Sequence, residues 1–109
     1  MANVWAKSLL TIGVVLSMSG IARADDYVLT LKDHQFSPAN LEIPVNQQVK
    51  LTVKNASAGE AEFESSDLSR EKLINPGGEI MVLIGPLSPG SYSYFDDFHR
   101  ESTGTIIVK

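Results

Sequence analysis

The sequence predicts an all-β protein, an antiparallel sandwich or barrel of about seven short strands. Two observations lead to this prediction. Short segments alternate apolar and polar residues with period two, and turn-forming Gly, Pro and Asn residues separate them roughly every eight to twelve positions. Only residues 67–73 could hold a helical turn, and that segment is short.

The strongest strand pattern lies at residues 49–54, where Val49, Leu51 and Val53 alternate with polar residues and are expected to share a buried face. The last twenty residues, 90–109, hold two strands with an acidic loop between them. In chain order, the predicted strands are 27–32, 41–43, 49–54, 62–64, 80–84 and the two strands within 90–109.

Residues 1–24 are predicted to be a cleavable secretory signal peptide. A single positive charge lies in residues 1–7, an apolar run without charge covers 8–21, and Ala22-Arg23-Ala24 supplies the small residues that a signal peptidase reads. The apolar run is too short to span a bilayer comfortably, although an uncleaved anchor is the alternative. Cleavage would leave residues 25–109 as one small domain that is not embedded in the membrane.

Composition narrows the classes of function. The chain has no cysteine, which excludes disulfides and any thiolate ligand or nucleophile. After signal cleavage, seven basic residues remain against 13 acidic ones. This negative net charge favours cations or a basic protein surface as binding partners. Nucleic acid is not expected as a partner. No Ser-His-Asp context or phosphate-binding glycine loop is recognisable, so enzymatic chemistry on organic substrates is not expected.

Two candidate metal ligands lie in the loop between the last two strands. Tyr92, Tyr94 and Asp96 alternate along the first of these strands, and because the two aromatic side chains favour the core, Asp96 is expected on the same inward side. His99 follows three residues later. Such a pair forms either a metal site or a polar network at the rim, and the inward position of Asp96 favours a functional role.

Further carboxylates come from two other segments and from the same loop. Glu62 and Glu64 flank Phe63 and would both face outward if Phe63 is in the core. Glu71 could approach them if its segment folds back. The alternative interpretation of Glu64, Glu71 and Asp97 is that they are solvated surface charges.

His34, the only other histidine, lies at the end of the first predicted strand. No residue of metal-binding spacing lies beside it in the sequence. We therefore expect His34 to be a surface residue, distant from the loop at 96–99.

The order of these segments resembles that of the cupredoxins. The resemblance rests on FSP at 36–38, LEIP at 41–44, VKLTVKN at 49–55, GPLSPGSY at 85–92, His99 and the closing strand at 104–108. It implies a Greek-key β-sandwich. In the blue-copper members, two His, a Cys and usually a Met hold a copper ion, a ligand set suited to electron transfer.

This sequence keeps the ligand positions of that family only in part. By the resemblance, the Cys position is Asp96 and the second His is His99, whereas the first His position falls near Glu62 and the Met position near Ser102. Without a thiolate, no blue-copper centre can form. The remaining donors imply iron, divalent copper or manganese. The implied ligands are Glu62, Asp96 and His99, with Glu64, Glu71 and Asp97 as further candidates.

Three acidic segments resemble a subgroup, the small periplasmic cupredoxin-like proteins of bacterial iron-uptake systems, including the FtrB type and the cupredoxin domain of the EfeO type. They are EFES at 62–65, REK at 70–72 and YFDDFH at 94–99. The resemblance implies a periplasmic protein that binds, oxidises or hands on iron, with copper as an alternative ion. It also implies a membrane iron permease or a second periplasmic metal protein as the partner, and leaves open an accessory role in ferrous iron oxidation.

The alternative function is of a different class, protein interaction. In this case the protein would be a metal-free sandwich that serves as an interaction module in a periplasmic complex. Its acidic rim would be the docking surface, and Phe95 and Phe98 would be apolar anchors. Metal analysis of the purified protein distinguishes this alternative from a metal-binding function.

Overall fold

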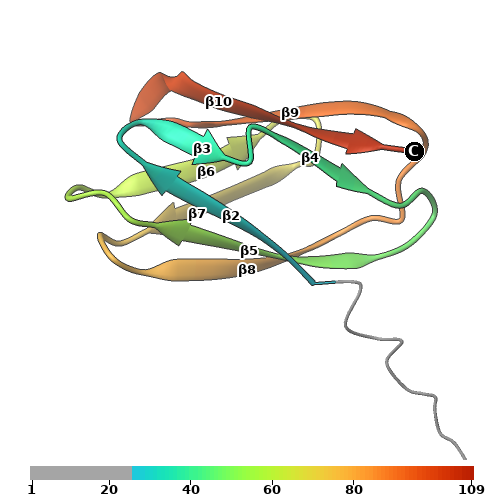
Figure 1. The fold of residues 1–109 in the computed structure, drawn as a ribbon, viewed down its shortest axis with the longest axis horizontal. Helices are drawn as coiled ribbons and strands as arrows, with labels where there is room; N and C mark the ends of the chain where they lie inside the picture. Colours follow the sequence, from blue (N-terminus) through green and yellow to red (C-terminus); the bar gives the residue numbers. More distant parts are fainter. Residues whose placement is uncertain (1–25) are drawn as a thin grey trace, which may run out of the picture.

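The computed structural model describes residues 26–109, which form only strands, turns and irregular segments (Figure 1). The predicted signal segment, residues 1–24, lies outside the described residues. Over the described range, no helix is long and apolar enough to cross a membrane. The strands are β2 (Asp26–Lys32), β3 (Gln35–Ser37), β4 (Asn40–Ile43), β5 (Val49–Asn55), β6 (Ala61–Ser65), β7 (Arg70–Ile74), β8 (Glu79–Ile84), β9 (Gly90–Asp96) and β10 (His99–Val108).

Two sheets form a sandwich, which confirms the predicted all-β fold class (Figure 1). One sheet has four strands in the order β3-β2-β5-β8, and the other has five in the order β4-β10-β9-β6-β7. The chain crosses from the first sheet to the second after β3 and returns before β5. β2 pairs parallel with β5, and β10 pairs parallel with β4. Both sheets are therefore mixed, whereas the sequence predicted a purely antiparallel sandwich.

The core lies between the sheets and follows the period-two pattern of the strands. Val49, Leu51 and Val53 are all buried on β5, as the alternation predicts. The five-stranded sheet contributes Phe63 and Tyr94, whose ring centroids lie 5.3 Å apart. The side chains on the opposite face of β6 and β9 therefore point away from the core, and this outer face carries one of the candidate sites.

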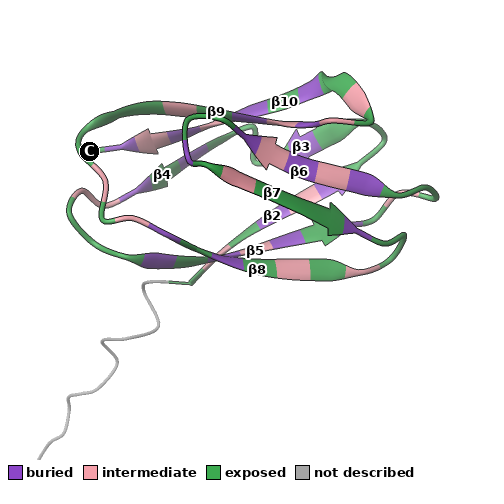
Figure 2. Cartoon of the chain, turned by 180° about the vertical axis from the view of Figure 1, so that it is seen from behind, coloured by how far each residue is buried: buried purple, intermediate pink, exposed green. Residues whose placement is uncertain are grey.

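One segment differs from its prediction. Residues 70–74 form the edge strand β7, paired antiparallel with β6, where a short helical turn was considered. Most of β7 is exposed, as Figure 2 shows. Because its residues do not alternate between buried and exposed positions, the segment lacks the period-two signal of a strand, and its pairing with β6 is set by the tertiary fold. With β3, it raises the number of strands in the described chain to nine.

Candidate metal centre

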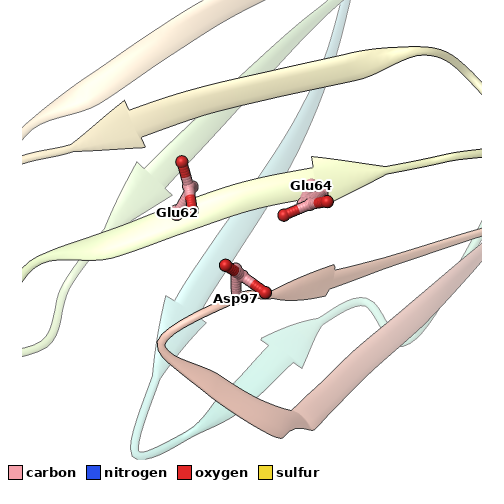
Figure 3. A group of neighbouring side chains, drawn as sticks. All are labelled: Glu62, Glu64 and Asp97. Atoms are coloured by element: carbon pink, nitrogen blue, oxygen red, sulfur yellow. The ribbon is translucent and has the colours of Figure 1, made fainter.

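Three carboxylates lie on the outer face of the five-stranded sheet (Figure 3). Glu62 and Glu64 alternate on β6 with Phe63, which is 1% exposed, so both face away from the core as predicted. Asp97 directly follows β9, and its backbone N–H donates to the Glu62 carbonyl at 2.9 Å, which holds the loop against β6. We call Glu62, Glu64 and Asp97 the acidic cluster.

The acidic cluster is compact enough to hold a cation. Each member offers an oxygen, and these three oxygens lie within 4.8 Å of one another. Partial burial, together with the neighbouring carboxylates of Glu71 and Asp97, raises the pKa of Glu62 from 4.5 to about 7. Glu62 is therefore only partly ionised near neutral pH, and a bound cation would favour the release of its proton.

Two more charged residues border the acidic cluster. Glu71 lies on β7 directly opposite Glu64, because its segment folds back and pairs antiparallel with β6, so its side chain is on the same outer face. Arg100 Nη2 lies 2.5 Å from Asp97 Oδ1, and the guanidinium also stands over the Phe95 ring at 5.1 Å from its centroid. The exposed Arg100 thus competes with any cation for the Asp97 carboxylate.

Asp96 lies on the other side of the same sheet, 2% exposed, as its inward position in the sequence predicts. Its Oδ1 accepts hydrogen bonds from the backbone N–H groups of Glu62, at 2.9 Å, and Phe98, at 3.0 Å. Its Oδ2 lies 3.2 Å from Nδ1 of His99. Since an ionised carboxylate can only accept, Nδ1 carries a proton in this contact. Asp96 therefore ties together β6, the loop after β9 and the His99 ring.

His34 differs from its prediction. It is exposed, as expected, but it is not distant from the loop at 96–99, because its ring centroid lies 4.5 Å from that of His99. The two-residue turn between β2 and β3 brings it to the end of the sandwich where β9 turns into β10. The sequence contains only a weak signal for this turn, because Asp33-His34 is not one of the glycine-containing pairs that are typical of two-residue hairpin turns.

A cavity of about 460 Å³ opens at this end of the sandwich, and His34, His99 and Asp96 line it. The rest of its wall comes mainly from the loop at residues 56–60. Asn55, which is 1% exposed, shapes that loop: its Nδ2 donates to the carbonyls of Gly59, at 2.9 Å, and Ile74, at 3.0 Å. The asparagine that ends the β5 motif is therefore a structural residue that fixes the wall of the cavity.

The structure divides the predicted ligand residues into two groups. Glu62, Glu64 and Asp97 come together on the outer face with Glu71 beside them, whereas Asp96 and His99 lie together on the inner side. Over residues 26–109, the acidic cluster is the one group of three His, Asp or Glu ligand atoms close enough to share an ion. Metal binding by either group stays a prediction.

Comparison with known proteins identifies the family of this domain. A family model described as a cupredoxin-like domain matches residues 7–108. An uncharacterized protein of Rickettsia prowazekii (strain Madrid E), RP394, is 38% identical over 99 residues, covering 86% of this chain and 79% of that protein.

Three solved structures are similar in fold. A purple cupredoxin from Nitrosopumilus maritimus has a TM-score of 0.62 and 23% identity, covering 77% of this chain and 100% of that one. Reduced auracyanin from Roseiflexus castenholzii has a TM-score of 0.65 and 15% identity, covering 78% and 97%. The metal-binding domain of the Cu(I)-exporting ATPase CopA from Streptococcus pneumoniae D39, with Cu(I), has a TM-score of 0.70 and 13% identity, covering 77% and 84%. At these identities, the likeness concerns the fold alone.

Proposed function

The chain belongs to the cupredoxin-like domain family, and on that premise we propose that it binds a hard metal cation through the acidic cluster. The observation that carries the proposal is the convergence of the Glu62, Glu64 and Asp97 carboxylates, with oxygens within 4.8 Å of one another. The sequence has no cysteine, so the thiolate of a blue-copper centre is absent, and the proposed ligands are oxygen donors on the outer face of the sheet.

Electrostatics supports a cation at this position. Three carboxylates converge, and Glu71 adds a fourth opposite Glu64, while Arg100 supplies one nearby positive charge. Partial burial, together with the like charges of Glu71 and Asp97, raises the pKa of Glu62 to about 7. A divalent or trivalent cation would remove that repulsion, and carboxylate oxygens are ligands that hard cations prefer.

We propose iron as the cation and an iron-uptake system as the setting. The support is the resemblance of the acidic segments at 62–65, 70–72 and 94–99 to those of periplasmic iron-uptake proteins. In this proposal, the protein is periplasmic and acts as a carrier that hands iron to a membrane permease or a second periplasmic metal protein. Copper in its divalent state is the alternative ion, because nitrogen and oxygen donors also suit Cu²⁺.

Calorimetric titration of the tag-free protein tests the proposal, with Fe²⁺ under anaerobic conditions, ferric citrate, Mn²⁺ and Cu²⁺ as ligands. We expect iron to bind, and a Glu62→Gln/Glu64→Gln variant to lose most of that affinity. Glu79→Gln is the matched control, since Glu79 is an exposed glutamate on β8 in the opposite sheet. Absence of iron binding, or equal binding by the double variant, would refute the proposal.

The pH dependence of iron binding gives a second readout. A cation competes with protons for the carboxylates, so its affinity should rise as pH increases through the Glu62 pKa of about 7. The double variant should lack this rise. A flat profile in the unmodified protein would place the cation elsewhere.

A second candidate function is docking of a basic partner protein on the same face. It is favoured by two exposed apolar side chains near the acidic cluster: Leu73, 50% exposed and opposite Glu62, and Phe98, 49% exposed and next to Asp97. A metal-free protein that binds a basic partner, and loses it in a Leu73→Ser/Phe98→Ser variant, would support docking over metal binding.

A further inference from the structure

The outer strand β8 of the four-stranded sheet has an unpaired edge. β8 pairs with β5 on one side, and no strand within residues 26–109 pairs with it on the other, so it ends the sheet (Figure 1). The Leu83 carbonyl accepts from the Arg70 side chain rather than from β5. Since alternate residues of an edge strand direct their backbone groups outward, the N–H and C=O groups of Glu79, Met81 and Leu83 face away from the sheet.

The other three sheet edges carry protection that β8 lacks. β7 has three charged residues in succession, β3 has only three residues, and β4 carries Glu42, which forms an ion pair with Lys109 at 3.1 Å. β8 reads EIMVLI, so it has no charged residue and no proline after Glu79. Charges, short length and proline are the means by which sheet edges avoid pairing with other chains. The edge of β8 is therefore the one in the described chain that is open to an added strand.

The side chains on the outer face of this edge strand are apolar. Met81 is 61% exposed and Leu83 is 53% exposed, and Figure 2 shows the exposed positions along β8. Val28 on β2 is exposed in the same row, because Thr52 of β5 pairs with both Val28 and Met81. An added strand would cover the apolar side chains of β8 and satisfy its free backbone groups together.

A second copy of β8 fits this edge. In an antiparallel pair with a two-fold axis at Met81, this residue faces Met81 of the second copy, and Glu79 faces Leu83. The outward N–H and C=O groups of these residues then exchange hydrogen bonds, and two polarisable thioethers meet at the axis. The Leu83 carbonyl can accept from the second strand and from Arg70 together, since a carbonyl oxygen has two lone pairs.

Charge complementarity selects this occupant and this register. Arg70 Nη2 lies 2.8 Å from the Leu83 carbonyl, so each copy holds a guanidinium beside the position that Glu79 of the second copy would take. Lys50, which pairs with Leu83 on β5, adds a second positive charge nearby. Within residues 26–109, Glu79 forms no ion pair of its own. A shift of the register by two residues in either direction would separate Glu79 from Arg70.

We propose that two copies of this chain form a symmetric dimer by antiparallel pairing of β8, which joins their four-stranded sheets into one sheet of eight strands. Because both copies use the same edge, the pairing is closed and does not continue into a filament. The acidic cluster lies on the outer face of the other sheet and stays accessible in the dimer. The dimer is therefore independent of metal binding and of the iron proposal.

Sedimentation equilibrium of the tag-free protein over a wide range of concentration tests the dimer. Met81→Lys places two ammonium groups opposite each other at the two-fold axis and should weaken association at least about tenfold. Val28→Lys is the matched control, because Val28 is exposed on the same face but lies two strands from the edge. It should leave association nearly unchanged, and circular dichroism should show that both variants are folded.

A charge exchange at the axis tests the register. Met81→Lys and Met81→Glu should each be largely monomeric alone, whereas a mixture of the two, one of them isotope-labelled, should form the mixed dimer in native mass spectrometry. The proposal is overturned if the unmodified protein is monomeric at every concentration or forms open-ended assemblies. It is also overturned if Val28→Lys weakens association as much as Met81→Lys, which would indicate stacking of the sheet faces, or if the mixture forms no mixed dimer.

Discussion

Replacement of Asp96 by alanine removes the acceptor of two backbone N–H groups and the partner of one imidazole. The Glu62 and Phe98 N–H groups would lose their bonds of 2.9 and 3.0 Å. A buried donor left without a partner costs about 1–3 kcal/mol. Because water can reach these partly buried donors, we expect about 1–1.5 kcal/mol for each, near the low end of that range, and a total loss of about 2–3 kcal/mol in the free energy of unfolding.

Asp96→Asn is the matched variant. Its side-chain oxygen can still accept from both backbone N–H groups, and the change mainly removes the charge from those bonds and from the contact with His99. Because both backbone donors keep an acceptor and lose only its charge, we expect a smaller loss than for alanine, about 1 kcal/mol. For a domain of this size, the alanine variant should then melt roughly 10–20 °C lower and the asparagine variant about 4–8 °C lower.

Urea unfolding followed by circular dichroism, with a chelator present, measures both values, and the slope of free energy against urea should not change. If Asp96 instead served only as a metal ligand, removing it from the metal-free protein would relieve an uncompensated buried charge and raise stability. An alanine variant as stable as the unmodified protein, or an asparagine variant as unstable as alanine, would refute the structural role.

Three other predictions concern the core, the charge of the acidic cluster and its competing arginine. Gly104→Ala should prevent folding or cost several kcal/mol, since a Cβ there would lie 2.3 Å from the Tyr94 ring, while Gly59→Ala, with nothing within 4 Å, should be neutral in denaturation curves. Stability should fall as pH rises from about 4.5 to about 7, because the folded protein keeps the Glu62 proton that the unfolded chain has lost, and Glu62→Gln should flatten that slope in unfolding curves taken across this range. Arg100→Gln should raise iron affinity up to about fivefold by calorimetry, because an exposed ion pair is worth at most about 1 kcal/mol, and lower affinity would contradict competition for the acidic cluster.

Local patterning predicts the parts of the fold that alternate. The burial of Val49, Leu51 and Val53, and the inward position of Asp96 beyond Tyr94, follow from the period of two along a strand. The edge strand β7 has no such period, since only its last residue, Ile74, is buried. Its strand conformation comes from pairing with β6, a tertiary interaction that no local pattern contains.

The candidate sites, like the strands, could be predicted only where they depend on local patterning. Because Glu62 and Glu64 flank a core phenylalanine, their shared outward face can be predicted, but the arrival of Asp97 beside them depends on the β6–β9 register. The distance between His34 and His99 depends on how the two sheets stack, since 64 residues separate two turns that meet at one end of the sandwich. Spacing in the sequence therefore suggested one site where the structure has two separate groups.

X-ray absorption spectroscopy of the iron-loaded protein tests the central proposal most directly, because it identifies the atoms around the metal. Coordination by the acidic cluster predicts a first shell of oxygen atoms alone, without the multiple-scattering features of imidazole, and loss of that shell in the Glu62→Gln/Glu64→Gln variant. Imidazole scattering around the iron, or an iron shell unchanged in that variant, would contradict it.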